Sequence, residues 1–215
     1  MLAEFLQYLF TGITIGATYA LVGLGFAIIY NASHVINFAQ GEFLMIGGMS
    51  TVMLTAMGVP LPVAILLAVA ASAVIGIALE KLAIEPAKDA DIVPLIIITI
   101  GASIFLRGVA QVIWGKEFHA LPSFSGDAPV VIGGATVLPQ SFWVLGVSIA
   151  VVVALGYFFN RTLIGKAMIA TAFNKDAARL MGINTRFVLM LSFALSAILG
   201  AVAGILVAPI TFTSY

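Results

Sequence analysis

The sequence is poor in charged residues and has no cysteine. Only 8% of its 215 residues are charged, whereas a typical soluble domain carries about 25%. Hydrophobic residues make up 62% of the chain and the mean hydropathy is +1.20, so lipid is the expected solvent for much of its surface. The missing cysteines exclude disulfides and thiolate metal sites. The net charge of zero gives no indication of a nucleic-acid partner.

Motifs that carry catalysis or hold a cofactor are also missing. The chain has no Gly-Lys-Ser/Thr phosphate loop, no HExxH, no GxSxG and no cluster of carboxylates, and His34 and His119 lie far apart. We therefore expect neither an enzyme nor a resident cofactor or metal. The N-terminus lacks the basic stretch of a secretory signal, and the apolar run over residues 5–30 is longer than the ~7–15 residues of a signal core. This run is interpreted as a retained membrane segment.

Six apolar segments dominate what is present. A membrane-spanning helix needs roughly 20 apolar residues, and the candidates cover residues 5–30, 43–57, 60–79, 92–114, 141–160 and 187–207. The sequence therefore predicts an all-α fold, a polytopic membrane helix bundle with about six transmembrane segments in one domain over residues 1–215. Pairs of small residues four apart are typical of helices that pack closely in lipid, and they occur at Gly12/Gly16, Ser72/Gly76 and Gly200/Gly204.

The distribution of Lys and Arg predicts the orientation of the bundle. Five of the nine lie in one polar loop, residues 161–186, which the positive-inside rule assigns to the cytoplasm. Counting back through the segments puts residues 80–91 inside and residues 122–140, which contain no Lys or Arg, outside. The N-terminus is then outside. This orientation predicts that Lys88, Lys166 and Lys175 face the cytoplasm and that Asp127 faces the outside.

One polar stretch interrupts the apolar segments. Residues 31–43 read NASHVINFAQGEF, and the segment that follows is too short, at ~1.5 Å per residue, to cross a ~30 Å core alone. The polar residues are therefore expected to enter the membrane, where such groups are tolerated only inside protein or beside a wet cavity. We predict that a substrate path is lined by Asn37, Gln40, Gly41 and Glu42. The alternative is a cytoplasmic turn in which Glu42 only complements the dipole of the next helix.

The basic loop over residues 161–186 has the pattern of two short helices joined by a capping residue. It reads RTLIGKAMIATAFNKDAARLMGINTR, in which Asn174 suits the N-cap position and Gly182 the position after the C-cap. The short helix between them has an apolar side made of Ala177, Ala178, Leu180 and Met181. Two alanines on a contact face favour close approach to a protein partner, while a surface helix lying on lipid and a solvated connector remain as alternatives.

This short helix resembles a known docking element. Asp176-Ala177-Ala178-x3-Gly182 is similar to the Glu-Ala-Ala-x3-Gly signature of ABC importer permeases, with Asp in place of Glu. In those proteins the loop forms a coupling helix that docks into a groove of the cytoplasmic ATPase. The Ile-x-Leu-Pro half of the signature is absent, because the corresponding residues are Ser192-Phe193-Ala194-Leu195.

The flanking motifs resemble one branch of these permeases. Residues 16–21 (GATYAL), 35–43 (VINFAQGEF), 165–168 (GKAM) and 177–184 (AARLMGIN) are similar, in order, to the branched-chain amino acid permease family of the LivH type. The resemblance implies a multi-pass permease of the bacterial inner membrane, with no cofactor and with ATP hydrolysis in separate subunits. It also implies ATPase coupling through Gly165, Asn174, Asp176, Ala177, Ala178, Arg179 and Gly182.

The resemblance predicts a membrane complex in the lipid bilayer. Its partners are cytoplasmic ATPase subunits, a second related permease and a periplasmic substrate-binding protein. Family members continue with further membrane helices, so a C-terminally truncated chain is expected. A permease for urea or short amides is an alternative of the same class. A non-ABC carrier or membrane scaffold is less favoured, because Arg107 is expected to snorkel outward with no acidic partner at its depth.

Overall fold

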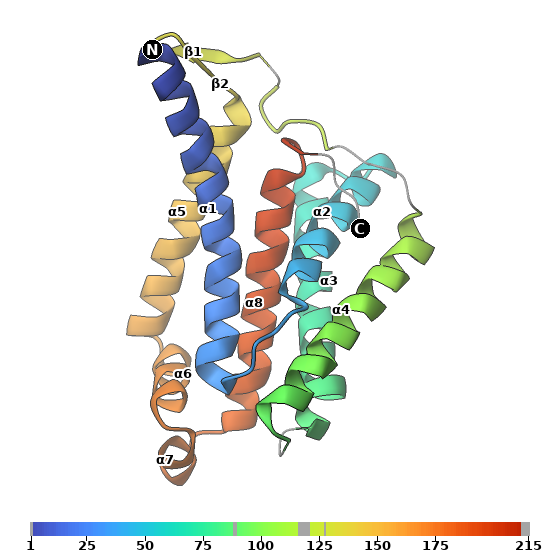
Figure 1. Ribbon diagram of the computed structural model, residues 1–215, viewed down its shortest axis with the longest axis vertical. Helices are drawn as coiled ribbons and strands as arrows, with labels where there is room; N and C mark the ends of the chain where they lie inside the picture. The colour runs from blue at the N-terminus through green and yellow to red at the C-terminus, as the bar shows by residue number, and fades with distance from the viewer. Residues whose placement is uncertain (1, 88–89, 116–120, 127, 212–215) are drawn as a thin grey trace.

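The computed structural model describes residues 2–87, 90–115, 121–126 and 128–211, which form the helix bundle of Figure 1. Its α-helices are α1 (Leu2–Ser33), α2 (Gln40–Ala56), α3 (Leu61–Leu79), α4 (Ile92–Trp114), α5 (Pro139–Arg161), α6 (Leu163–Phe173), α7 (Lys175–Leu180) and α8 (Thr185–Val207). Within the described chain, five helices are long and apolar enough to cross a membrane, whereas α2, with 17 residues, is shorter than these. The predicted all-α membrane bundle is confirmed.

The second predicted segment differs from the others in where it starts. Helix α1 ends beside α6. The chain then runs back into the bundle through residues 34–39, so that α2 begins near the middle of the bundle's height (Figure 1). His34 makes the reversal, with a φ of 57° in the left-handed region. The 17 residues of α2 cover only about 25 Å. The polar stretch therefore enters the bundle, as its sequence predicts.

Helix α8 is the centre of the bundle and packs against α1, α2 and α3 (Figure 1). Two of the three predicted small-residue pairs explain how closely it packs. A side chain at Gly204 would collide with the backbone of Leu44 in α2, and one at Gly76 of α3 would come within 2.7 Å of the Cβ of Ala197. By contrast, in the described structure a Cβ added at Gly12 or Gly16 of α1 would have open space around it, with no contact within 4 Å beyond its own helix backbone.

A short hairpin lies over one end of the bundle, which we call the hairpin end. Strands β1 (Val130–Ile132) and β2 (Ala135–Val137) pair antiparallel, and Gly133 and Gly134 turn the chain at positive φ. The side-chain amide of Gln7 fixes the hairpin to α1, because it donates to the Thr136 carbonyl at 2.8 Å and accepts from the Thr136 N–H at 2.6 Å. The sequence pattern did not predict these two strands.

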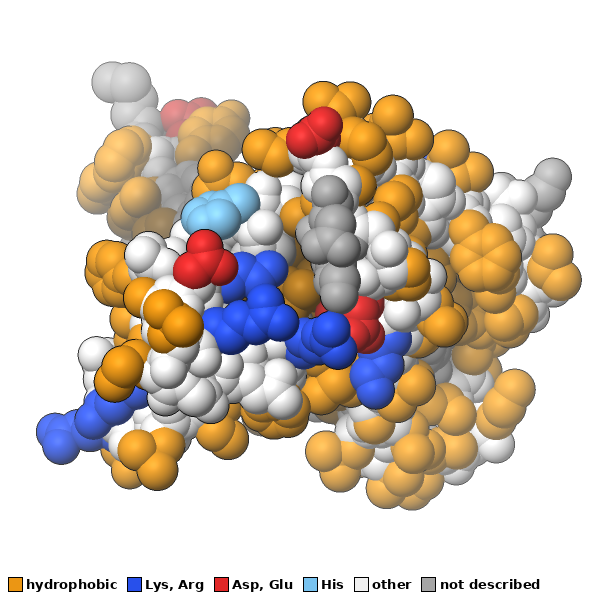
Figure 2. All heavy atoms as spheres, turned by 90° about the horizontal axis from the view of Figure 1, so that it is seen from below, with side chains coloured by type: hydrophobic (Ala, Val, Ile, Leu, Met, Phe, Trp, Pro, Cys, Tyr) orange, Lys and Arg blue, Asp and Glu red, His pale blue; other side chains and the backbone are white. Residues whose placement is uncertain are grey.

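The opposite end carries the charge and is called the basic end. It is formed by α6, α7 and the continuation of α3 through the π-helix η1 (Glu80–Ile84) and the 3-10 turn η2 (Glu85–Ala87). Figure 2, seen from this end, shows Lys and Arg side chains gathered across the surface. Of the Lys and Arg residues that the structure describes, only Arg107 lies elsewhere. Lys88 and Asp127, two of the orientation markers, lie outside the described residues.

Candidate functional site

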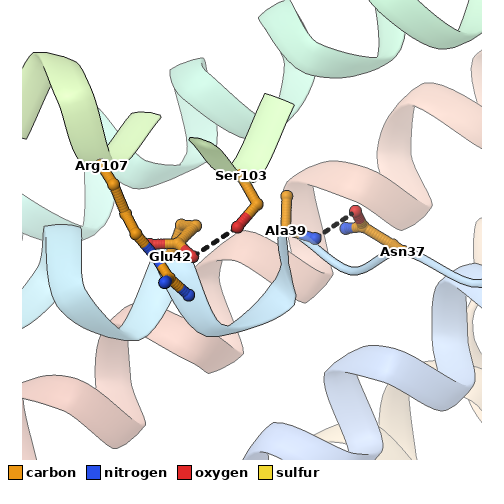
Figure 3. Close-up of polar contacts among 5 residues, drawn as sticks. All are labelled: Asn37, Ala39, Glu42, Ser103 and Arg107. Atoms are coloured by element: carbon orange, nitrogen blue, oxygen red, sulfur yellow. Dashed lines mark hydrogen bonds and ion pairs between the residues drawn. The ribbon is translucent and has the colours of Figure 1, made fainter. Parts of the chain in front are cut away.

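The polar segment before α2 is irregular backbone inside the bundle, so its polar groups need partners. The Phe38 N–H donates to the Thr99 hydroxyl oxygen of α4 at 3.3 Å. The single hydroxyl proton of Thr99 is shared between the Ile36 carbonyl at 3.2 Å and the Ile96 carbonyl of its own helix at 2.9 Å. The Ala39 N–H donates to the Asn37 side-chain oxygen at 3.0 Å (Figure 3). These bonds fix the chain just before the first turn of α2.

Glu42 lies in that first turn and pairs with α4. Its side chain is almost fully buried, and its Oε1 accepts from the Ser103 hydroxyl at 2.7 Å and from Arg107 Nε at 2.9 Å (Figure 3). The expectation that Arg107 has no acidic partner at its depth is therefore wrong. The fold brings two residues together that are 65 positions apart in the sequence. A non-ABC carrier was less favoured because Arg107 was expected to have no acidic partner. The ion pair with Glu42 removes that argument.

The four predicted path residues point in different directions. Gln40 turns toward α8, where its Oε1 accepts from the Ser196 hydroxyl and its Nε2 donates to the Ser196 carbonyl at 3.3 Å. Asn37 is buried, and its Nδ2 has no hydrogen-bond partner among the residues that the structure describes. Glu42 faces α4, whereas Gly41 is exposed and has open space where a Cβ would be. Of the four, Gly41 borders a cavity. The assignment of all four to a substrate path stays a prediction.

That cavity is a cleft of about 620 Å³ that runs from the hairpin end to the N-terminus of α2. Along α1 it extends from Gln7 to Val22, which is about 22 Å at 1.5 Å per residue. Most of its wall is apolar, and its polar lining on α1 includes Thr11, Thr14 and Thr18. The size lies within the roughly 300–1,000 Å³ of small-molecule sites.

The short helix at the basic end is built as its sequence predicts. Asn174 is the N-cap of α7, and its side chain accepts from the Ala177 N–H at 2.9 Å. Gly182 follows the C-cap at a φ of +86°, and its N–H donates to the Arg179 carbonyl at 3.1 Å. These local bonds make α7 a well-defined unit between α6 and α8.

The predicted contact side of α7 is divided by the fold. Ala178 is buried against the rest of the chain, whereas Ala177 is exposed, together with Leu180 and Met181, which are 89% and 83% exposed. Asp176 and Arg179 are also exposed. A Cβ on Gly165 would collide with the Phe158 carbonyl, so the close turn between α5 and α6 requires glycine there. The coupling assignment of these residues stays a prediction.

The polar contacts of α4 were not predicted from the sequence. Thr99, Ser103 and Arg107 are four residues apart, and this spacing places polar groups on one side of an otherwise apolar helix. The spacing was visible in the sequence and could have indicated a polar contact for α4. In the part of the chain that the structure describes, no group of three or more His, Asp or Glu side chains could hold a metal ion.

Comparison with known proteins identifies the family. The family model described as branched-chain amino acid transport system / permease component matches residues 8–215. The high-affinity branched-chain amino acid transport system permease protein LivH of Salmonella typhimurium is 33% identical over 219 residues, covering 94% of this chain and 70% of the relative. BraD of Pseudomonas aeruginosa, a protein of the same description, is 31% identical with the same coverage.

A more distant relative carries a different substrate name. The galactofuranose transporter permease protein YtfT of Escherichia coli is 29% identical over 198 residues, covering 89% of this chain and 53% of the relative. No solved structure matches the chain. The predicted localisation, a multi-pass protein of the bacterial inner membrane, agrees with the five apolar spans and with these bacterial permeases. From the match over nearly its whole length, the chain belongs to the family of branched-chain amino acid transport system permease components.

Proposed function

We propose that this chain is the membrane permease subunit of an ABC importer for branched-chain amino acids, with ATP hydrolysis supplied by separate subunits. The family match carries the proposal. Relatives named for branched-chain amino acids match at 31–33% identity over 70% of their length, whereas the galactofuranose permease matches at 29% over 53% of its length. The higher identity and coverage favour the amino-acid substrates over a sugar.

The cleft at the hairpin end supports a path for a small apolar zwitterion. Its apolar wall suits the side chains of leucine, isoleucine and valine. Gly41 borders its inner end in the first turn of α2, where the helix dipole leaves partial positive charge. The neighbouring Gln40 and Glu42 N–H groups already donate to the Asn37 and Ala39 carbonyls, so the dipole is what favours a carboxylate there. In this proposal Gly41 borders the path, and Asn37, Gln40 and Glu42 fix the helix end beside it.

The basic end supports coupling to a cytoplasmic ATPase. Ala177, Leu180 and Met181 form an exposed apolar surface on a capped helix that projects from the bundle (Figure 1). An apolar helix face of this kind suits a groove on a protein partner. We place this end in the cytoplasm, since Lys and Arg gather there. A second related permease and a periplasmic substrate-binding protein complete the proposed complex.

Uptake of radiolabelled leucine, isoleucine and valine tests the proposal in cells that lack other importers for them. This chain is expressed with candidate ATPase, permease and binding-protein partners, and the uptake of radiolabelled urea and fructose is measured in parallel. We expect uptake of the three amino acids. Ala177→Trp should abolish it and prevent co-purification of the ATPase, because a bulky side chain blocks close docking. The matched control is Ala128→Trp, at an exposed position near the hairpin, which should retain both.

Two outcomes would contradict separate parts of the proposal. Uptake of urea or fructose without uptake of leucine would overturn the substrate while leaving the family intact. An unchanged amount of ATPase with Ala177→Trp would mean that α7 is not the docking element. Membrane insertion of every variant is checked by its recovery in the membrane fraction.

A further inference from the structure

A row of three polar side chains on α4 contacts the polar segment and the first turn of α2. Thr99 is fully buried and bonds to the backbone at Phe38 and Ile36, while Ser103 and Arg107 both donate to the Glu42 carboxylate. Because the three are four residues apart, they lie along one side of the helix. They meet residues 36–42 in the same order along the axis of α4, so one helix contacts both the irregular segment and the first turn of α2.

The rest of the α4 surface shows why this row matters. Ile97, Ile104 and Phe105 are each more than 60% exposed in the isolated chain, which suits lipid or another apolar surface. Arg107 is also partly exposed, with 59% of its side chain accessible, yet its Nε is directed to a carboxylate that is only 4% exposed. A charged side chain at membrane depth is costly, and pairing reduces that cost. The geometry therefore gives Arg107 a specific partner.

We infer that the Thr99–Ser103–Arg107 row of α4 positions the N-terminus of α2, and that Arg107 is a positioning residue acting through Glu42. Irregular backbone inside a membrane protein persists only where its polar groups have partners. The row supplies a partner for the Phe38 N–H, for the Ile36 carbonyl and for the Glu42 charge. Without Arg107, the Glu42 carboxylate is buried without its cation, and the first turn of α2 is expected to shift toward water in the cleft.

The position of Gly41 makes this shift measurable. Gly41 lies between Gln40 and Glu42, borders the cleft and has free space for a side chain. The chain has no cysteine, so Gly41→Cys gives a single reactive site at the end of α2. Thr11→Cys provides a matched reporter, because Thr11 borders the same cleft from α1 and is exposed. The effect on uptake rests on the proposed function, whereas labelling needs neither substrate nor ATPase.

The experiment measures the rate at which a small water-soluble maleimide labels each reporter in membranes. Arg107→Gln should change the labelling rate of the cysteine at position 41 about tenfold or more, since a hydrogen bond to a charged group is lost. The rate at position 11 should stay the same. Arg107→Lys keeps a cation near Glu42 and should restore most of the original rate at position 41. The double variant Glu42→Gln/Arg107→Gln leaves no charge unpaired and should also restore it.

Uptake is measured in chains that carry the same substitutions without the reporters. It should fall with Arg107→Gln, as a lower maximal rate, and recover with Arg107→Lys. An unchanged labelling rate at position 41 in Arg107→Gln would overturn the inference and restore the interpretation that Arg107 snorkels. Recovery of labelling without recovery of uptake in Arg107→Lys would also overturn it, since the guanidinium would then act in transport other than through the position of α2.

A milder variant covers the case in which Arg107→Gln does not fold. Ser103→Ala removes one hydrogen bond to Glu42 and leaves the ion pair in place. It should shift labelling at position 41 in the same direction by up to about tenfold, the lower end of the range for one lost hydrogen bond to a charged group. The shift should be smaller than with Arg107→Gln, because the carboxylate keeps its cation. Equal labelling with and without Ser103→Ala in folded protein would contradict the proposed positioning.

Discussion

Helices α8 and α4 are attached to the bundle in two different ways. In α8, 72% of the most apolar stretch is buried, and its small residues meet α2 and α3 so closely that an added Cβ would collide with neighbouring atoms. In α4 the corresponding share is 17%, and in the described structure a Cβ added at Gly101 or Gly108 would have open space around it, with no contact within 4 Å beyond its own helix backbone. Its hydrogen bonds to other elements run through Thr99, Ser103 and Arg107.

This difference follows from the solvent. Lipid gives little hydrophobic reason for two apolar helices to associate, so contact depends on close packing or on polar groups that lack water. Helix α8 relies mainly on the first route, because Gly200 and Gly204 let α2 approach, and it adds one polar contact between Ser196 and Gln40. Helix α4 combines apolar contacts of Leu95 and Ala110 with a polar row. Close packing fixes α8 along its length, whereas the polar row ties α4 to one short segment.

The largest expected effect comes from adding one methyl group to α8. Gly204→Ala should prevent correct folding, because its Cβ would collide with the Leu44 backbone and backbone cannot move aside as a side chain can. Overpacking of a core typically costs about 1–3 kcal/mol, and we expect at least that. The measurement is the recovery of monodisperse protein in detergent and its thermal unfolding. Gly101→Ala of α4 is the control and should unfold like the parent; similar losses for both variants would remove the contrast between the helices.

A smaller effect is expected for the polar row. Thr99→Val keeps the shape of the side chain but leaves the Phe38 N–H without the Thr99 hydroxyl, at a cost of about 1–3 kcal/mol in unfolding free energy. Thr51→Val is the control. Thr51 is equally buried, but its hydroxyl donates only to the Gly47 carbonyl of its own helix. Thermal unfolding in nanodiscs compares the two, and an equal decrease would mean that the link from α4 to Phe38 adds no stability.

Features set by local chemistry could be predicted from the sequence. The cap at Asn174 and the turn at Gly182 depend on residues within one helical turn, and both have the predicted form. The ends of α3 and α4 agree with the predicted segments to within one residue, because Pro60 and the polar residues around Asp91 interrupt the apolar runs. Local signals of this kind do not require knowledge of the fold.

Features set by tertiary contact could not be predicted in the same way. Glu42 and Arg107 are 65 residues apart, and Gln40 and Ser196 are 156 apart, so only the folded bundle brings them together. One part of the site could have been anticipated. Successive residues of a helix point about 100° apart, so Gln40, Gly41 and Glu42 could not all face one cavity once α2 began at Gln40. The prediction from the sequence places all three on one surface of the substrate path.

The smallest expected effect concerns the ion pair between Arg186 and Glu85 at the basic end. Comparing it with the pair between Arg107 and Glu42 separates the effect of the charge from the effect of its surroundings. Arg186 Nε lies 3.9 Å from Glu85 Oε1, and 62% of the arginine side chain is exposed, so water and salt screen the pair. Glu85→Gln should therefore change the unfolding free energy by less than about 1 kcal/mol. Glu42→Gln also removes one negative charge beside an arginine, but this carboxylate is buried in the bundle. It should therefore lower the unfolding free energy by more than Glu85→Gln does. Thermal unfolding at low and high salt compares the two variants. If Glu85→Gln proved as destabilising as Glu42→Gln, burial in the bundle would not explain the strength of the contact between Glu42 and α4.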